Sequence, residues 1–275
     1  MTFHQRFLQI TRDKNSLLCV GLDPDLRRMP DVIQGHPKPL FRFCSEIIES
    51  TKHVAAAYKL NFAFFEAEGS RGWASLEELV QAIPSNILKI ADAKRGDIAN
   101  SSEMYARAIL ERLGFDAVTV NPYLGGDSVE PFLQWPEKGA FILCVTSNPG
   151  SNEFQHFSDG CKPLYMRVLE QVQKWNTRHN IGLVVGATHA NELKSLRKAA
   201  PHLPFLIPGI GTQKGDLREA VLHGTDEKGQ LAIINSSRSI IYKSNKSDFA
   251  EAAKREAELL REKINQIRKA KISIQ

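Results

Sequence analysis

The sequence has 275 residues, of which 42% are hydrophobic and 24% charged, a composition typical of a folded globular protein and long enough for one domain spanning 1–275. Its net charge of +5 is mild, and the densest basic stretch, 255–271, is interrupted by glutamates, so a nucleic-acid-binding protein is not expected. No apolar run is long enough to span a bilayer and no secretory leader is recognisable, so we expect neither a membrane protein nor a secreted one.

The four cysteines show neither CxxC spacing nor a grouping with histidine that would indicate a zinc site. Cys19 and Cys144 lie inside apolar runs, where cysteine usually acts as a small core residue. Unpaired thiols are typical of a reducing compartment, so we expect a cytoplasmic protein.

After an amphipathic segment at residues 1–15, short apolar runs alternate with amphipathic stretches along the chain. The runs that predict strands are Leu17–Leu22, Ala55–Phe65, Ile87–Ala93, Ala117–Asn121, Ala140–Thr146, Ile181–Gly186, Pro204–Ile210 and Leu231–Asn235. The stretches that predict helices are Phe41–His53, Leu76–Ile83, Ser101–Leu113, Pro163–His179, Ala190–Ala200, Lys214–Leu222 and Asp248–Ile267.

This alternation predicts a parallel sheet, and eight strand–helix units in about 250 residues are typical of a (β/α)₈ TIM barrel with outer helices. A doubly wound open sheet is the alternative, but it would usually show fewer strands, and no Gly-x-Gly-x-x-Gly follows the first run. Two long connections, 24–39 and 147–162, follow strand ends. In a barrel they would border the catalytic face.

Charged residues gather where the third apolar run ends. Asp92 and Lys94 are two residues apart, so alternation along a strand turns both toward the mouth of the barrel, and Asp97 follows in the loop. Considered by itself, this group of charged residues could be an ion-pair cluster with a purely structural role. Charges at this end of a barrel strand favour a catalytic role.

The first two runs carry further polar residues at their ends. Asp23 follows the first run, where an Asp-Pro turn would also explain it. Lys59 and Asn61 share one face of the second run, and a lysine inside an apolar strand needs a partner, which Asp23 or Asp92 could supply.

The last two runs end in features that favour phosphate binding. Gly209 and Gly211 would let backbone N–H groups approach an anion closely, and Arg238 follows the eighth run. Loops after strands 7 and 8 of this fold often bind phosphate, although turns and a surface charge would explain the same residues.

Seven motifs in this order resemble the orotidine 5′-phosphate decarboxylase family. They are VGLDPD, YKLNFAFFE, DAKRGDIANSS, VTVNPYLG, CVTSNPGS, IPGIGTQ and NSSRSI, and they span residues 18–240. YKLNFAFFE and TSNPGS are similar to the branch found in many bacteria and some protists. The resemblance implies a cofactor-free, metal-free enzyme that converts orotidine 5′-monophosphate (OMP) to uridine 5′-monophosphate (UMP), the last step of de novo pyrimidine nucleotide synthesis.

The resemblance also implies the catalytic roles. Lys94 would protonate C6 of the pyrimidine as carbon dioxide leaves, and Asp92 would lie beside the departing carboxylate. Lys59 would hold Asp92 and contact the ribose, with Asn61 beside it in the substrate site. Asp97 would reach into the neighbouring site of a homodimer, followed by Ser101.

The remaining roles concern binding of the substrate. Asp23 would bind the ribose, and Ser147 would form a hydrogen bond with the pyrimidine edge. Gln213 would bridge base and phosphate, while Gly211 and Arg238 would hold the phosphate. The segment after Ile267 matches no motif, so we expect a frayed tail there.

Two other functions remain open at this stage. A magnesium-dependent phosphosugar decarboxylase or synthase of the same superfamily shares the D-x-K-x-x-D pattern, although the TSNPGS and GTQ segments suit a pyrimidine nucleotide better. A catalytically silent nucleotide-binding barrel would keep the same fold and phosphate loops.

Overall fold

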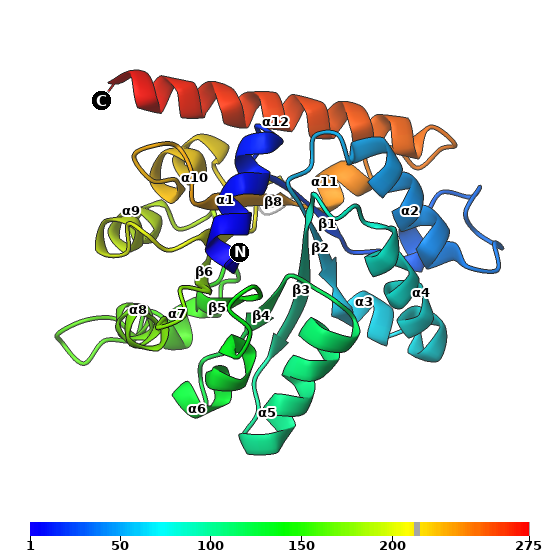
Figure 1. Cartoon of the computed structure of the whole chain (residues 1–275). Coiled ribbons are helices and arrows are strands. Elements are labelled where there is room, and N and C mark those ends of the chain that lie inside the picture. Colours follow the sequence, from blue (N-terminus) through cyan, green and yellow to red (C-terminus); the bar gives the residue numbers. More distant parts are fainter. Residues whose placement is uncertain (212–214, 275) are drawn as a thin grey trace.

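The structure is a computed structural model that describes residues 1–211 and 215–274. Eight parallel strands close into a barrel in chain order, and pairing of the first strand with the eighth leaves no open edge (Figure 1). The strands are β1 (Leu18–Leu22), β2 (Ala57–Asn61), β3 (Leu88–Arg95), β4 (Ala117–Val120), β5 (Gly139–Val145), β6 (Ile181–Val185), β7 (Phe205–Ile207) and β8 (Ala232–Ser236). The predicted (β/α)₈ barrel is confirmed, and the open sheet is excluded.

Helices surround the barrel, and the long C-terminal helix lies across one side of it, against α2, α10 and α11 (Figure 1). The α-helices are α1 (Phe3–Asp13), α2 (Pro39–Thr51), α3 (Phe62–Glu66), α4 (Gly69–Ala82), α5 (Ala99–Ala106), α6 (Gly126–Val129), α7 (Ser151–Phe154), α8 (Leu164–Trp175), α9 (Ala190–Ala199), α10 (Leu217–Gly224), α11 (Arg238–Ile241) and α12 (Phe249–Ile274). Short 3₁₀ turns at Leu26–Arg28 and Glu130–Leu133 and a π-helical turn at Arg107–Arg112 complete the connections.

The barrel interior is apolar at one end, and α1 seals that end. Phe3 and Phe7 of α1 pack with inward-facing residues of the strands, and Phe3 meets the ring of Phe141 edge-on at 5.9 Å. Gly139 makes room for this contact, because a Cβ there would lie 2.5 Å from the Phe3 ring. The N-terminal segment therefore closes the barrel floor and leaves the opposite end of the strands for a site.

A second apolar layer lies between the strands and the outer helices. It includes buried side chains from α2, α4, α9 and α12, such as Phe43, Leu76, Leu193 and Ile264. Cys19 and Cys144 are buried as predicted, and burial raises the pKa of the Cys19 thiol to about 12. Within the described residues, no helix combines the length and apolar character needed to cross a membrane.

Two predictions about local structure were wrong. The expected strand Ala55–Phe65 ends at Asn61, and Phe62–Glu66 forms α3, because the Asn61 side chain caps the helix by accepting a hydrogen bond from the Ala63 N–H. The expected frayed tail is also absent up to residue 274. α12 continues to Ile274, and the Lys271 ammonium donates to the carbonyl oxygens of Leu222 and Thr225.

Candidate active site

At the carboxyl ends of the strands the inward-facing positions change from apolar to polar. Along β3, Leu88 and Ile90 belong to the interior core, whereas Asp92, the next residue on that face, lines a cavity. The cavity has a volume of about 500 Å³. Seven of the predicted site residues line it: Asp23, Lys59, Asn61, Asp92, Lys94, Ser147 and Arg238. The fold therefore brings together residues from the ends of five different strands.

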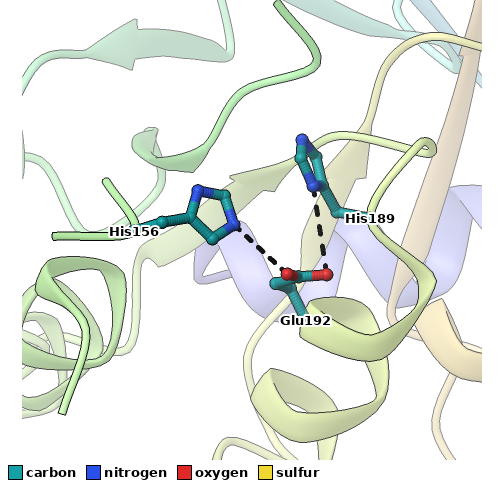
Figure 2. A group of neighbouring side chains, drawn as sticks. All are labelled: His156, His189 and Glu192. Atoms are coloured by element: carbon teal, nitrogen blue, oxygen red, sulfur yellow. Dashed lines mark hydrogen bonds and ion pairs between the residues drawn. The ribbon is translucent and has the colours of Figure 1, made fainter. Parts of the chain in front are cut away.

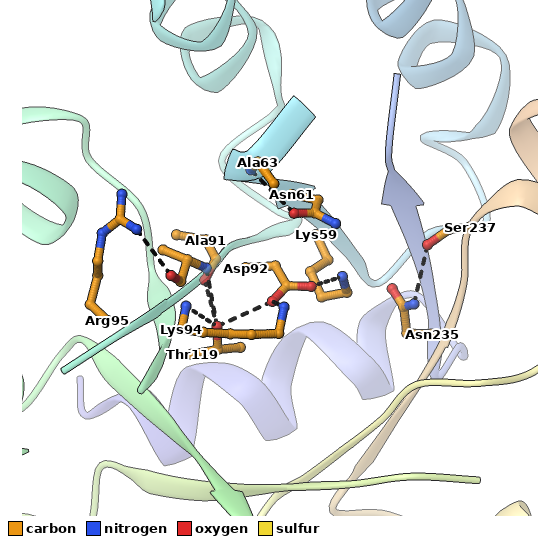
Figure 3. Close-up of polar contacts among 11 residues, drawn as sticks. Lys59, Asn61, Ala63, Ala91, Asp92, Lys94, Arg95, Thr119, Asn235 and Ser237 are labelled. Carbon is orange, nitrogen blue, oxygen red and sulfur yellow. Dashed lines mark hydrogen bonds and ion pairs between the residues drawn. The ribbon is translucent and has the colours of Figure 1, made fainter. Parts of the chain in front are cut away.

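The centre of the cavity wall is a carboxylate held between two ammonium groups (Figure 3). Lys59 of β2 pairs with Oδ2 of Asp92, and Lys94 pairs with Oδ1 at 2.5 Å. The side chains of Lys59 and Asp92 are 6% and 11% exposed, whereas that of Lys94 is 52% exposed. Both expected partners of Asp92 are thus in place, and Lys94 is the member that a bound ligand can reach.

The charges of this group are mutually stabilised. Burial alone would lower the pKa of Lys59, but the nearby carboxylates of Asp92 and Asp23 raise it above its usual range. Burial alone would raise the pKa of Asp92, yet the two lysines lower it below its usual range. Lys59 and Asp92 are therefore both charged near neutral pH, because each buried charge is paired.

Lys94 reaches Asp92 from a strained backbone position, not from a regular strand. Its φ is +47°, and the register between β3 and β4 shifts between Ala91 and Arg95. The Thr119 hydroxyl oxygen on β4 accepts hydrogen bonds from the Ala93 and Lys94 N–H groups at 3.1 and 2.9 Å, and lies 3.2 Å from Asp92 Oδ1. Thr119 thereby holds both the bulge and the carboxylate (Figure 3).

Opposite this cluster, the loops after β7 and β8 are fastened together. The Ser236 hydroxyl contacts the Ile210 carbonyl and, at 2.6 Å, the Ser239 hydroxyl. Gly211 has a φ of +99°, and a Cβ there would lie 2.6 Å from the Ser239 hydroxyl. The exposed Arg238 and residues Gly209 and Ile210 line the same part of the cavity. Gly211 and Arg238, both predicted to hold a phosphate, therefore lie on loops that contact each other.

Two glycines of other strand ends permit this packing. A Cβ on Gly21 would lie 1.8 Å from the Ser237 hydroxyl, so β1 needs glycine where the β8 loop crosses it. A Cβ on Gly186 would lie within about 3 Å of the backbone of Ser147. Glycine after β6 therefore allows the loop that carries Ser147 to approach the cavity.

The loop after β5 has its own hydrogen-bond brace. Gln155 accepts from the Thr146 N–H at 2.7 Å and donates to the Thr146 hydroxyl at 2.8 Å. That hydroxyl donates to Asn148 at 2.6 Å. These three residues and Ser147 all line the cavity, so the predicted long connection contributes one of its walls.

Two buried oxygen atoms at the cavity have no hydrogen-bond partner among the described residues. They are Oδ1 of Asp23 and Oδ1 of Asn235, which lies on β8. A buried acceptor without a donor is costly, and a ligand that supplies hydroxyl groups removes that cost. The arrangement is therefore suited to a polyhydroxylated ligand.

The remaining predicted residues are located elsewhere. Asp97 does not line the cavity in the described part of this chain, and its Oδ1 accepts a hydrogen bond from the Ile98 N–H at 2.8 Å. Ser101 is exposed on α5, and Gly211 contacts α11 beside the cavity. Gln213 falls outside the described residues.

Comparison with known proteins identifies the family. The model of the "Orotidine 5′-phosphate decarboxylase / HUMPS family" matches residues 16–254. An orotidine 5′-phosphate decarboxylase of Dehalococcoides mccartyi strain CBDB1 is 49% identical over 273 residues, which cover 98% of this chain and 99% of the relative. The chain belongs to the orotidine 5′-phosphate decarboxylase / HUMPS family.

Solved structures of the family agree with the barrel described above. OMP decarboxylase of Leishmania donovani is 40% identical with a TM-score of 0.84, and the match covers 98% of this chain and 99% of that one. UMP synthase of the same organism is 41% identical with a TM-score of 0.86 and contains the fold in a longer chain, since the match covers 98% of this chain but 57% of that one.

Sequence reasoning missed several residues that shape the site. Thr119 and Asn235 are polar residues at inward positions near the ends of apolar strands, so a count by twos along β4 and β8 could have found them. Gln155 carries no such signal, because its place follows from the path of the loop. Gly21 and Gly186 show their importance once the neighbouring loops are placed.

We predict that Asp92→Asn lowers the free energy of unfolding by about 3 kcal/mol at pH 7, because Lys59 then keeps a buried charge with a weakened partner. The pKa of Asp92 is lowered by folding, so its contribution is complete above the ordinary value of 3.8 and declines as the pH falls below it. Urea unfolding of both proteins from pH 3 to 7 measures their free energies of unfolding. The difference between wild type and Asp92→Asn should be constant above about pH 4 and become smaller below it.

The matched control for this experiment is Asp25→Asn, which removes an aspartate paired with the exposed Arg27. Its effect on stability should be far smaller, because exposed ion pairs contribute little. An Asp92→Asn protein as stable as the wild type at pH 7 would refute the account of the buried ion pair.

Proposed function

We propose that this chain decarboxylates OMP to UMP, the carboxy-lyase reaction that ends de novo pyrimidine nucleotide synthesis. The observation that carries the proposal is the Lys59–Asp92–Lys94 cluster at the cavity, in a chain 49% identical to an orotidine 5′-phosphate decarboxylase over its length. The exposed end of Lys94 is the reactive group of the proposal.

Loss of carbon dioxide from C6 of the pyrimidine leaves an electron pair that the ring delocalises poorly. The Lys94 ammonium stabilises this developing charge and then transfers a proton to C6, which completes UMP. Two unit charges ~4 Å apart attract by roughly 4 kcal/mol at an effective dielectric constant of 20. This contact therefore supplies part of the rate enhancement, and the rest comes from exclusion of water and from orientation.

In this proposal Asp92 and Lys59 position the reactive lysine. Asp92 binds Lys94 directly, and Lys59 keeps Asp92 ionised in a buried place. The substrate carboxylate would lie beside the Asp92 carboxylate and be repelled by it. Loss of carbon dioxide removes this repulsion. Lys94 is thus held by a carboxylate whose own orientation is determined by Lys59 and Thr119.

The other walls of the cavity suit the remaining parts of the nucleotide. The unpaired Oδ1 atoms of Asp23 and Asn235 can accept hydrogen bonds from ribose hydroxyls, with Asn61 and Lys59 close by. Ser147 on the β5 loop is assigned to the pyrimidine edge. Arg238, with the backbone of Gly209–Gly211, is assigned to the phosphate, and Gln213 is assigned to bridge base and phosphate.

The magnesium-dependent reaction of the wider superfamily fits the site less well. Magnesium is usually held by one or two carboxylates together with substrate oxygens. Both oxygens of Asp92 already contact lysine ammonium groups, which leaves Asp23 as the other carboxylate among the described residues of the cavity. A single available carboxylate and two adjacent cations disfavour a divalent ion here.

A homodimer is part of the same proposal, with Asp97 and Ser101 completing the site of the partner. Large apolar side chains are exposed around these two residues. Ile98, Met104 and Tyr105 flank or lie on α5, and Tyr123 and Leu124 lie in the adjacent loop after β4, where the Asn121 N–H bonds to the Arg95 carbonyl. An apolar surface of this kind favours burial against a second copy.

The proposed location is the cytoplasm. All four cysteines are free thiols, and Cys161 is exposed, which fits a reducing compartment.

We predict that Lys94→Ala lowers the rate of OMP decarboxylation by more than about 10⁴-fold, because it removes both the charge that stabilises the carbanion and the proton donor. The loss of OMP ultraviolet absorbance, followed in EDTA, measures the reaction and its independence from metal. Lys38→Ala, which removes an exposed lysine paired with Glu78, is the control and should react like the wild type. Near-normal turnover by Lys94→Ala would remove Lys94 from the mechanism, and a folded wild type without turnover would indicate a silent nucleotide-binding barrel.

We predict that Arg238→Ala raises KM for OMP by about 10- to 100-fold, the loss expected for a hydrogen bond between charged groups. With orotidine, which lacks the phosphate, Arg238→Ala and wild type should have the same kcat/KM. The control is Arg255→Ala, which removes an exposed arginine paired with Asp248. It should leave kcat/KM unchanged for both substrates. An unchanged KM for OMP in Arg238→Ala would contradict the phosphate assignment.

We predict that inactive Lys94→Ala and Asp97→Ala proteins regain activity when their subunits are exchanged. A mixed dimer would contain one site with Lys94 from one chain and Asp97 from the other, so an equal mixture should reach about a quarter of wild-type activity. Activity that stays absent after subunit exchange, confirmed by size measurement of tagged chains, would place Asp97 outside the partner's site.

A further inference from the structure

A second group of potential ligands lies beside the active-site loop. His156 lies between α7 and α8, His189 precedes α9, and Glu192 lies in the first turn of α9. Each side chain is between 19% and 24% exposed, so the group is accessible without lying free on the surface. None of the three residues lines the active-site cavity, and the proposed decarboxylation makes no use of them.

The three side chains converge on one point. Both imidazole rings turn toward the Glu192 carboxylate (Figure 2). His156 Nε2 lies 3.2 Å from Oε1, and His189 Nδ1 lies 3.9 Å from Oε2. One ligand atom from each residue falls within 4.8 Å of the others. Zinc bonds of about 2.0–2.2 Å place two ligand atoms of one ion about 3.3 Å apart, so small side-chain rotations bring this group to that geometry.

A hydrogen bond outside the group already selects the tautomer that a metal requires. His189 Nε2 lies 3.0 Å from the Thr146 carbonyl oxygen, which can act only as an acceptor. Nε2 therefore carries the proton, and a neutral His189 ring directs the lone pair of Nδ1 toward Glu192. Donation of the second ring N–H to a backbone carbonyl is the usual support of a metal-bound histidine.

We propose that His156, His189 and Glu192 form a binding site for a divalent transition-metal ion, with zinc as the best match, that fastens the loop after β5 to α9. Two imidazoles and one carboxylate are a ligand set that zinc accepts, with the fourth position left for water. Imidazole nitrogen disfavours magnesium and calcium, which prefer oxygen ligands.

The position gives such an ion a structural effect on the catalytic cavity. His156 directly follows Gln155, which braces Thr146, and His189 bonds to the Thr146 carbonyl. An ion held by His156 and His189 therefore joins both sides of the loop segment that carries Ser147. It stabilises the wall of the cavity and takes no part in the chemistry at Lys94.

The test uses the whole enzyme, freed of metal with EDTA and then dialysed, and titrated with zinc chloride in a calorimeter. We expect one zinc ion per chain and, at a free zinc concentration about 100-fold above Kd, a rise in Tm of roughly 5–10 °C. Amide hydrogen exchange in the 147–163 segment should slow at the same zinc concentration. These measurements need no substrate, so they stand apart from the test of decarboxylation.

Glu192→Gln and His156→Gln are nearly isosteric and should each lose the bound ion and the shift in Tm. Their circular dichroism, and their turnover of OMP in EDTA, verify that each variant folds. The matched control is His223→Gln, which removes a histidine from the surface pair of His223 with Glu219 and should bind zinc like the wild type. Cys161→Ser, which removes the exposed thiol, should also keep the ion.

A wild type without bound zinc would overturn the proposal. Equal zinc binding by wild type, Glu192→Gln and His156→Gln would overturn it too, because the ion would then be held elsewhere. Loss of the ion in the first two variants together with its retention in His223→Gln and Cys161→Ser would establish the site.

Discussion

The site depends on one carboxylate, Asp92, that is buried between two ammonium groups. A buried ion is tolerated when its partners compensate the lost hydration, so the positions of Lys59, Lys94 and Asp92 constrain one another. The neighbouring strand satisfies the same constraint, since the Thr119 hydroxyl reaches both the carboxylate and the backbone at Lys94. The positive φ of Lys94 is maintained by these contacts. Strain at this residue is thus the local cost of presenting an ammonium group to the cavity.

The barrel separates this costly arrangement from the part of the molecule that provides stability. Near the floor, Phe3 and Phe7 of α1 close an interior composed of apolar side chains. Toward the other end, the same inward faces carry lysine, aspartate, threonine and asparagine. Because successive residues of one strand alternate between the interior and the outer layer, two residues along β3, from Ile90 to Asp92, lead from the core to the cavity.

Much of this architecture could be read from the sequence, because buried parallel strands are short apolar runs and eight of them indicate a closed barrel. A carboxylate partner for Lys59 was also predictable, since a lysine within an apolar strand requires one, but the strand pattern left Asp23 and Asp92 both open. The formation of helix α3 by residues 62–66 could not be predicted. An aromatic run suits either a strand or a helix, and the Asn61 cap decides between them. The bulge at Lys94 escaped prediction for a similar reason. It depends on a hydroxyl of β4 that is 25 residues away along the chain.

For the proposed reaction, the exposure of Lys94 shows what the isolated chain still needs. Its side chain is half exposed, and water at that position would weaken the attraction between its ammonium group and a developing carbanion. In the proposed homodimer, the substrate, the loop after β5 and the second copy of the chain are the groups that can displace this water. The proposed binding of the phosphate at Arg238, which lines the same cavity as Asp92, then has a use beyond affinity, since it can draw the loop after β5 over Lys94. Energy gained at one end of the nucleotide is in this way converted into a drier environment at the other, where the reaction occurs.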